Sequence, residues 1–199
     1  MTHPRPVDGA VGPRLALPTG LVHLSFVAAM EEFRAEGRGG DDDDTTLGRT
    51  LRDYGDKWHD PVVFERYVCE VRAAARPAEP LSVPVTTLWY ADGADYFGRI
   101  AIRHNVATRF LREYGGHIGY DVRPTARRRG HATAMLIDSL PYARELGLES
   151  VLVTCDTDNT GSRKVIEAAG GVFEDERGGK LRYWVRTGSR PDSPNQHPH

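Results

Sequence analysis

The sequence has few of the residues that build disulfide or metal frameworks. Its 199 residues include only two cysteines, Cys69 and Cys155, which are far apart in the chain. This number excludes a disulfide scaffold and a cysteine-based metal cluster, and we expect no bound metal. Unpaired cysteines are typical of a reducing compartment, so we expect two buried thiols in a cytoplasmic protein.

The sequence also lacks an excess of positive charge and a long apolar run. It has 26 Lys and Arg against 28 Asp and Glu, so it lacks the basic face that nucleic acid requires. Residues 21–30 are mostly apolar, but His23 and Ser25 interrupt them, and the run is about half the length that a spanning helix needs. We therefore expect neither a nucleic-acid partner nor a membrane, while a homodimer stays open.

Composition and length predict one domain with short extensions. Residues 1–17 contain several prolines and glycines and should form a flexible lead-in. The domain should cover residues 18–187, and residues 188–199 should be a disordered tail. The four adjacent carboxylates of Asp41–Asp44 predict a mobile, solvated loop. A calcium loop is the alternative, but it would need alternating ligands and a distal glutamate, which are missing here.

Hydrophobic spacing predicts an alternation of helices and strands. Pro141 falls inside one expected helix and should kink it. The segment between the second and third expected strands should be a connector with Phe110 and Leu111 facing inward. In chain order we expect a helix from Leu21 ended by Gly37, a helix from Pro61 ended by Pro77, strands at 85–90, 96–103 and 116–122, a helix after Gly130 ended by Gly147, a strand at 149–156, a helix at 159–171 and a strand at 180–186.

The segment from Gly115 to Ala132 carries the strongest functional signal. Ile118, Tyr120 and Val122 alternate as in a half-buried strand, and Pro124 ends that strand. Three arginines and Gly130 follow at residues 127–130, directly before a helix. Backbone N–H groups and the helix dipole converge at such a loop, so it predicts a site for phosphate or pyrophosphate. Gly130 would let the backbone approach the anion closely.

The motif Arg127-x-x-Gly130-x-Ala132 resembles the Q/R-x-x-G-x-G/A pyrophosphate loop of the GNAT N-acetyltransferase superfamily. The following strand and the asparagine-led helix from Asn159 extend the resemblance over residues 84–186. It implies an α/β fold in which two central parallel strands, 116–122 and 151–155, splay apart with coenzyme A in the gap. Helices would flank the mixed sheet, with acceptor-side helices in residues 21–75 and the cofactor half in residues 84–186.

By this resemblance the protein is an N-acetyltransferase that uses acetyl-CoA as its acyl donor. The acceptor would be a primary amine of a small molecule or a protein, and nothing in the sequence identifies it. The family often has a tyrosine as general acid seven residues after the asparagine, and here that position is Ile166. The alternative is therefore a catalytically degenerate module that binds coenzyme A as a sensor or scaffold.

The resemblance also assigns candidate site residues. His117 and His104 are the candidate bases because histidine titrates near neutral pH, with Glu113 or a water chain as alternatives. Each histidine also fits a purely structural, hydrogen-bonded role. Tyr120 or Tyr183 could replace the missing acid, and Asn159 fits both a helix cap and a cofactor contact. The expected cofactor-binding residues are Tyr120, Asp121, Val122, Arg127, Arg128, Arg129, Gly130, His131, Ala132, Asn159 and Ser162.

Overall fold

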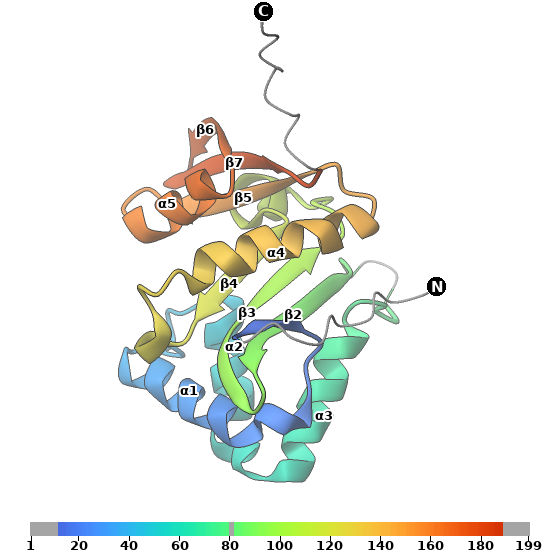
Figure 1. Cartoon of the computed structure of the whole chain (residues 1–199), viewed down its shortest axis with the longest axis vertical. Helices are drawn as coiled ribbons and strands as arrows, with labels where there is room; N and C mark the ends of the chain where they lie inside the picture. Colours follow the sequence, from blue (N-terminus) through green and yellow to red (C-terminus); the bar gives the residue numbers. More distant parts are fainter. Residues whose placement is uncertain (1–11, 80–81, 189–199) are drawn as a thin grey trace, which may run out of the picture.

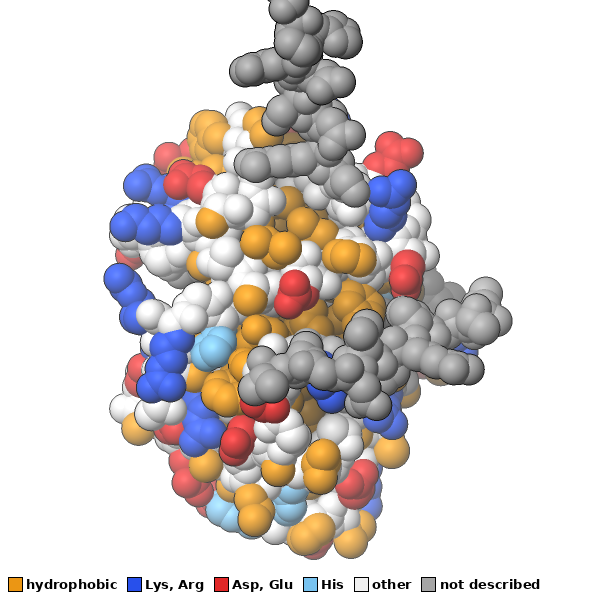
Figure 2. Space-filling view, viewed as in Figure 1, with side chains coloured by type: hydrophobic (Ala, Val, Ile, Leu, Met, Phe, Trp, Pro, Cys, Tyr) orange, Lys and Arg blue, Asp and Glu red, His pale blue; other side chains and the backbone are white. Residues whose placement is uncertain are grey.

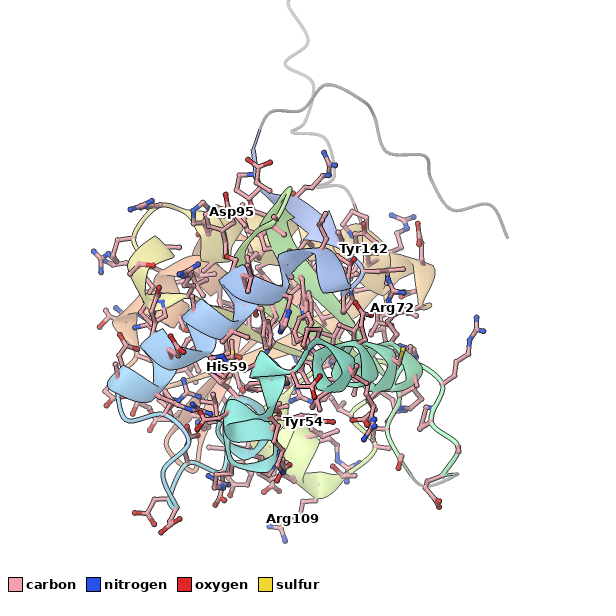
Figure 3. The ribbon with its side chains drawn as sticks, turned by 90° about the horizontal axis from the view of Figure 1, so that it is seen from below. Tyr54, His59, Arg72, Asp95, Arg109 and Tyr142 are labelled. Carbon is pink, nitrogen blue, oxygen red and sulfur yellow. The ribbon has the colours of Figure 1, made fainter. Side chains whose placement is uncertain are left out.

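A computed structural model describes residues 12–79 and 82–188 of the chain (Figure 1). A mixed sheet has the strand order β1-β2-β3-β4-β5-β7-β6. Helices α1 to α3 cover one face (Figure 3), and α4 and α5 cover the other. The elements are β1 (Arg14–Ala16), η1 (Gly20–Val22), α1 (His23–Ala35), α2 (Thr46–Tyr54), η2 (Gly55–His59), α3 (Pro61–Ala73), β2 (Val85–Asp92), β3 (Asp95–Arg103), η3 (Leu111–Gly115), β4 (Ile118–Val122), η4 (Pro124–Ala126), α4 (His131–Glu145), β5 (Ser150–Asp156), α5 (Thr160–Ala168), β6 (Val172–Arg177) and β7 (Lys180–Arg186).

Local sequence explains where several helices begin. The Thr45 side chain accepts a hydrogen bond from the Gly48 amide and caps α2, and Asp60 caps α3 with Pro61 in the first helical position. Pro141 lies inside α4, as predicted. These caps satisfy amides that a helix cannot bond internally, so the helices begin at defined residues.

Each face of the sheet has its own hydrophobic core. The core under α1 to α3 is rich in aromatic side chains, with Phe26 at its centre, 5.1 Å from Trp58 and 5.2 Å from Trp89 between ring centroids. The core under α4 and α5 is mostly aliphatic and includes Leu136 and Val153. The sheet is thus packed on both of its faces.

The central strands splay apart, which confirms the predicted fold. β4 and β5 are the parallel pair, and their register has a single paired position, Ile118 with Val153. All other neighbours in the sheet pair antiparallel. Just before this joint, a Cβ on Gly116 would lie 2.5 Å from the Leu152 carbonyl oxygen, so only glycine fits there. Beyond the joint β4 and β5 diverge and leave one edge of β4 unpaired.

Several local predictions were wrong. β1, α2 and β6 were not predicted, and β1 lies within the segment expected to be a loose lead-in. Phe110 is 65% exposed rather than buried, whereas Leu111 faces inward as expected. Cys69 is exposed, whereas Cys155 is buried as predicted. Residues 1–11 of the expected lead-in and nearly all of the expected tail lie outside the described residues.

The four-aspartate segment is not uniformly solvated. The Asp43 carboxylate accepts hydrogen bonds from the Arg38 side chain at 2.7 Å and the Gly39 amide at 3.1 Å. Burial opposes the charged form, but bonds from Thr45 and Arg38 outweigh it and lower the pKa of Asp43. Asp43 therefore anchors this loop, while Asp41, Asp42 and Asp44 are exposed.

No helix within residues 12–79 and 82–188 is both long enough and apolar enough to cross a membrane. The same residues contain no group of three or more His, Cys, Asp or Glu side chains that could hold a metal ion.

Candidate active site

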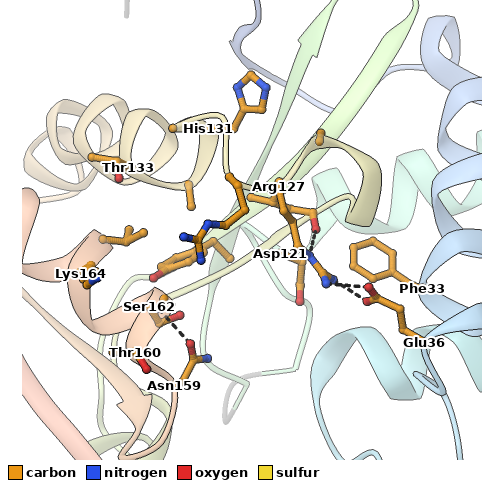
Figure 4. Close-up of a pocket in the computed structure, with 18 of the residues that line it drawn as sticks. Phe33, Glu36, Asp121, Arg127, His131, Thr133, Asn159, Thr160, Ser162 and Lys164 are labelled. Atoms are coloured by element: carbon orange, nitrogen blue, oxygen red, sulfur yellow. Dashed lines mark hydrogen bonds and ion pairs between the residues drawn. The ribbon is translucent and has the colours of Figure 1, made fainter.

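A cleft of about 750 Å³ opens where β4 and β5 separate (Figure 4). Its walls come from the free edge of β4, the loop before α4, the first turns of α4 and α5, and the end of α1. The lining residues are Phe33, Glu36, Arg38, Tyr120, Asp121, Val122, Ala126, Arg127, Arg128, Gly130, His131, Ala132, Thr133, Asn159, Thr160, Gly161, Ser162, Lys164 and Val165. Most residues that the sequence assigned to cofactor binding therefore lie around one cavity.

The hydrogen-bond pattern of β4 shows which backbone groups are free. The His117 carbonyl accepts a bond from the Arg103 amide at 2.8 Å, and the Arg123 amide donates to β3 at 2.8 Å. In an antiparallel pair such residues alternate, so the odd-numbered residues of β4 bond to β3. The main-chain groups of Tyr120 and Val122 consequently face the gap. The amide and carbonyl of Tyr120 and the amide of Val122 are groups that an extended ligand could use, whereas the Val122 carbonyl accepts a bond from Arg127 Nε at 3.1 Å.

Asp121, the third residue predicted on this strand, contributes its side chain instead. Its main chain belongs to the β3 ladder, and its carboxylate lies 3.1 Å from Arg99 Nε and 3.9 Å from Arg38 Nη1. Burial opposes the charge on Arg99, but Asp121 outweighs it and raises the pKa of that guanidinium. Asp121 thus forms a charged wall at the cleft.

The loop before α4 has the geometry of an anion site. Gly130 has φ 82° and precedes α4 without any side-chain cap, and the first intrahelical bond joins the Ala134 amide to the Gly130 carbonyl. The amides of residues 131–133 therefore have no partner within the helix. These donors and the positive end of the helix dipole face the cleft, and Lys and Arg side chains gather at this edge of the molecule (Figure 2).

The three arginines of the loop differ in position. Arg127 donates two bonds to Glu36 at 2.8 and 2.7 Å, and its Nε donates to the Val122 carbonyl (Figure 4). The positive charge of Arg127 is thus already balanced by the Glu36 carboxylate, directly after α1. Arg128 lines the cleft and Arg129 does not. Of the three predicted cationic contacts, Arg128 is the one placed to meet an anion directly.

The start of α5 supplies the opposite wall. The Asn159 Oδ1 accepts a bond from the Ser162 amide at 2.9 Å, so Asn159 is the helix cap, and it also lines the cleft. Lys164, which sequence reasoning missed, adds a cation to this wall. No sequence motif marks Lys164. The only available signal is its position five residues after the cap Asn159, within the first two turns of α5.

Tyr120 carries an unused polar group into the site. Its hydroxyl is buried and has no hydrogen-bond partner among the described residues. Burial raises the pKa of Tyr120 to about 12; the Ser162 hydroxyl is close enough to oppose this shift, although it does not meet the geometry of a hydrogen bond, and Cys155 adds to the shift. The hydroxyl therefore stays protonated at physiological pH and is available as a donor.

His117 does not have the geometry of a general base. It is 5% exposed, it is not among the cleft-lining residues, and its Nδ1 accepts a bond from the Leu152 amide at 2.9 Å. A neutral imidazole that accepts at Nδ1 carries its proton on Nε2. Burial, and secondarily Arg103, lowers the pKa of His117. The ring is neutral and its lone pair is occupied, so this structure assigns it to the β4–β5 joint.

The other catalytic candidates also lie away from the cleft. His104 Nε2 is 2.8 Å from Thr86 Oγ1, beyond the end of β3, and burial lowers its pKa. Glu113 pairs with Arg109 at 2.9 Å. Ile166, at the position of the family's tyrosine, is fully buried in the core. None of these side chains lines the cleft.

A splayed parallel pair with a free strand edge, next to an uncapped helix N-terminus, matches the cleft that the resemblance implies for coenzyme A-dependent acyltransferases. The sequence confirms a specific family within this class. The model of the GNAT acetyltransferase domain matches residues 49–172, so the chain belongs to the GNAT acetyltransferases, which are acetyl-CoA-dependent N-acetyltransferases.

Solved structures share the fold at low sequence identity. The microcin C7 self-immunity acetyltransferase MccE, in complex with acetyl-CoA and AMP, is 12% identical with a TM-score of 0.57, covering 89% of this chain and 93% of its own. The ribosomal L7/L12 alpha-N-protein acetyltransferase RimL with coenzyme A is 12% identical with a TM-score of 0.58, covering 89% and 95%. RimJ of Mycobacterium smegmatis with CoA-disulfide is 18% identical with a TM-score of 0.58, covering 88% and 86%.

Comparison with curated protein sequences gives no match.

Proposed function

We propose that this protein transfers the acetyl group of acetyl-CoA to a primary amine. The observation that carries the proposal is the free edge of β4, where Tyr120 and Val122 offer main-chain groups to a cleft that ends at an uncapped helix. A long ligand with a pyrophosphate at one end and amides along its arm has the matching chemistry. The amides of residues 131–133 would hold the pyrophosphate, and Arg128 and Lys164 would add positive charge.

The transfer itself needs few protein groups. The amine nitrogen attacks the thioester carbonyl, the carbon–sulfur bond breaks, and sulfur leaves as a thiolate. A main-chain N–H on β4 would polarise the carbonyl, and the Tyr120 hydroxyl would give its proton to the leaving thiolate. The amine proton would pass to water, because neither candidate base, His104 or His117, lines the cleft. His131 does line it, but at the first turn of α4, where the pyrophosphate would bind.

The acceptor remains a proposal at the level of a primary amine. RimL is by its name an alpha-N-protein acetyltransferase, which supports testing peptide amines as well as small ones. Thiol release from acetyl-CoA should be measured over polyamines, amino acids, aminoglycosides and short peptides, with mass spectrometry of each product.

Acetylated product with at least one amine is the expected result. Coenzyme A binding without transfer to any of them would instead favour the sensor or scaffold function, for which the buried Ile166 is the supporting observation. We also propose a cytoplasmic location, supported by the two free cysteines, which cell fractionation would test.

A further inference from the structure

The sheet face under α1 to α3 presents two arginines beside the splayed strands. Arg99 and Arg103 lie four residues apart on β3, so both point to the same face. Between them stands Ala101, which pairs with Gly119 of β4. No side chain larger than a methyl group therefore separates the two guanidinium groups on these two strands.

The two arginines differ in their partners. Arg99 forms an ion pair with Asp121 at 3.1 Å. Arg103 donates from Nη1 to the carbonyl oxygens of Gly115 and Gly116 at 3.1 and 3.2 Å, and no carboxylate of the described residues lies within 4.0 Å of it. Arg103 is thus a half-buried cation without a counter-charge, an arrangement that costs free energy unless an anion binds.

The charged neighbours of Arg103 increase this cost. Burial, then Arg49 on α2, then Arg99 lower the pKa of Arg103. Asp121 is occupied by Arg99, and Glu113 of the adjacent segment pairs with the exposed Arg109. The charges that act on Arg103 are therefore positive, and an anion placed there would relieve their mutual repulsion.

Arg103 is also close to the opening between the strands. Its two terminal nitrogens lie 3.9 Å from the position that a Cβ on Gly119 would occupy. Gly119 follows the Ile118 joint and precedes Tyr120, whose main chain faces the gap. Ile118, Tyr120 and Val122 of β4 pack in the core under α4 and α5, whereas the core under α1 to α3 includes no residue of this strand. An acceptor could therefore approach β4 from the face that carries Arg103.

We propose that Arg103, supported by Arg49, binds an anionic group of the acceptor, so that the preferred substrate is a primary amine that also carries a carboxylate or a phosphate. This inference rests on the proposed acetyltransferase function. The planar guanidinium matches either oxyanion with two parallel hydrogen bonds. Such a site would orient the amine toward the thioester and select against polycations.

The test compares amines that differ only in the anionic group. The pairs are β-alanine with β-alaninamide, phosphoethanolamine with ethanolamine, and the peptide amines Ser-Asp-amide with Ser-Asn-amide; putrescine is the cationic probe. kcat and KM are measured for the wild type, Arg103→Gln, Arg103→Lys and the charge-matched control Arg72→Gln. Arg72 lies on the exposed outer side of α3 (Figure 3). Calorimetry with coenzyme A is run on every variant.

We expect the wild type and Arg72→Gln to prefer the anionic member of at least one pair by roughly ten- to a hundred-fold in kcat/KM, mainly through KM, as for a charge-assisted hydrogen bond. Arg103→Gln should lose this preference while its coenzyme A affinity stays unchanged, and Arg103→Lys should keep part of it. The pair that shows the effect distinguishes a carboxylate from a phosphate.

Acetylation without a preference for anionic amines would overturn this inference and leave the proposed function intact. The same holds if Arg103→Gln retains the preference, or if putrescine is the best acceptor. If Arg103→Gln does not fold, the inference is tested by the preference of the wild type within each substrate pair and by the reduction of that preference in Arg103→Lys. Coenzyme A binding with no acetylation of any probe would overturn the inference together with the proposed function.

Discussion

The two ends of β4 differ in how their polar groups are used. At the closed end, His117 satisfies both backbone groups of Leu152: its own amide donates to the Leu152 carbonyl at 2.7 Å, and its ring accepts the Leu152 amide. At the open end, Tyr120 has a free main chain facing the gap and a hydroxyl without a partner. The chemical type of a side chain therefore does not by itself identify a reactive residue. The groups available for chemistry are those that the fold leaves without a hydrogen-bond partner.

The largest expected effect concerns the open end. Gly130→Asp should weaken acetyl-CoA binding by about a thousand-fold or more, because it places a negative charge beside the uncapped helix. The positive φ of Gly130 strains any side chain placed there, but no atom lies within 4 Å of an added Cβ. Asp is among the residues that adopt this conformation most readily, so we expect the fold to tolerate the substitution. Calorimetry measures the affinity.

Gly130→Asn is the matched control for this variant. It has the same shape and the same backbone strain without the charge, and it should bind much more tightly than Gly130→Asp. Equal affinities for the two variants, or an unchanged affinity in folded Gly130→Asp, would show that the anion does not lie at this helix.

The second-largest expected effect concerns the Tyr120 hydroxyl at the open end of β4. Tyr120→Phe should lower kcat by roughly ten- to a hundred-fold, at the lower end for a general acid because a thiolate leaves readily. The affinity for acetyl-CoA should change little. Because the pKa of Tyr120 is raised to about 12, the wild-type kcat should show no loss from its ionisation between pH 7 and 10.

Tyr183→Phe provides the comparison for the tyrosine variant. Tyr183 is the other tyrosine considered as a general acid, and its hydroxyl lies 3.5 Å from a Glu167 carboxylate oxygen. We expect its kcat to stay near the wild-type value. A Tyr120→Phe enzyme with full activity, or a larger loss in Tyr183→Phe, would remove Tyr120 from the mechanism.

At the closed end the effect should be on stability. His117→Ala leaves the buried Leu152 amide without an acceptor, which should cost about 2 kcal/mol in the free energy of unfolding. The kcat of the folded fraction should stay within about three-fold, far less than the loss of a general base would cause. Urea unfolding and steady-state kinetics on the same sample separate the two roles, and a hundred-fold loss of kcat would restore His117 as the base.

His117→Asn sharpens this test because its Oδ1 can replace Nδ1 as the acceptor. It should recover part of the lost stability without restoring a titratable group. The pKa of His117 is lowered from 6.5, so its stabilising contribution is present above pH 6.5 and is lost as pH falls below that value. The stability advantage of the wild type over His117→Asn should therefore shrink below pH 6.5.

The smallest effect compares two neighbouring aspartates. Asp43→Ala should lose about 1 kcal/mol of stability because the bonds from Arg38 and Gly39 disappear. Asp42→Ala should change the thermal midpoint very little, since Asp42 is exposed. Neither should alter acetyl-CoA affinity. Equal midpoints for the two variants would mean that Asp43 does not anchor the loop.

Local patterns predicted the parts of the site that are local in the chain. The alternation of Ile118, Tyr120 and Val122, the position of Gly130 and the cap at Asn159 each depend on near neighbours, and all can be seen in the sequence. The roles of Arg127 and His117 could not be predicted in this way. Glu36 lies 91 residues from Arg127 and Leu152 lies 35 residues from His117, and no local signal indicates either partner.

The missed elements have a similar physical cause. β6 carries four adjacent charged residues at 174–177 and is mostly exposed, so it lacks the apolar alternation that marks a strand. β1 has three residues and exists only because it pairs with β2. Both strands form only by pairing with a neighbouring strand at an edge of the sheet, and sequence pattern alone does not reveal such edge strands.

The single paired position between Ile118 and Val153 divides the sheet into two blocks, β1 to β4 and β5 to β7. A ligand that bonds to the free edge of β4 would act as an additional strand between them. Since it would bind only the folded state, at a hundred times its dissociation constant it would add about 2.7 kcal/mol to folding stability. The lifetime of this protein in the cell would then follow the supply of its acyl donor, so that a shortage of acetyl-CoA reduces the amount of enzyme as well as its rate.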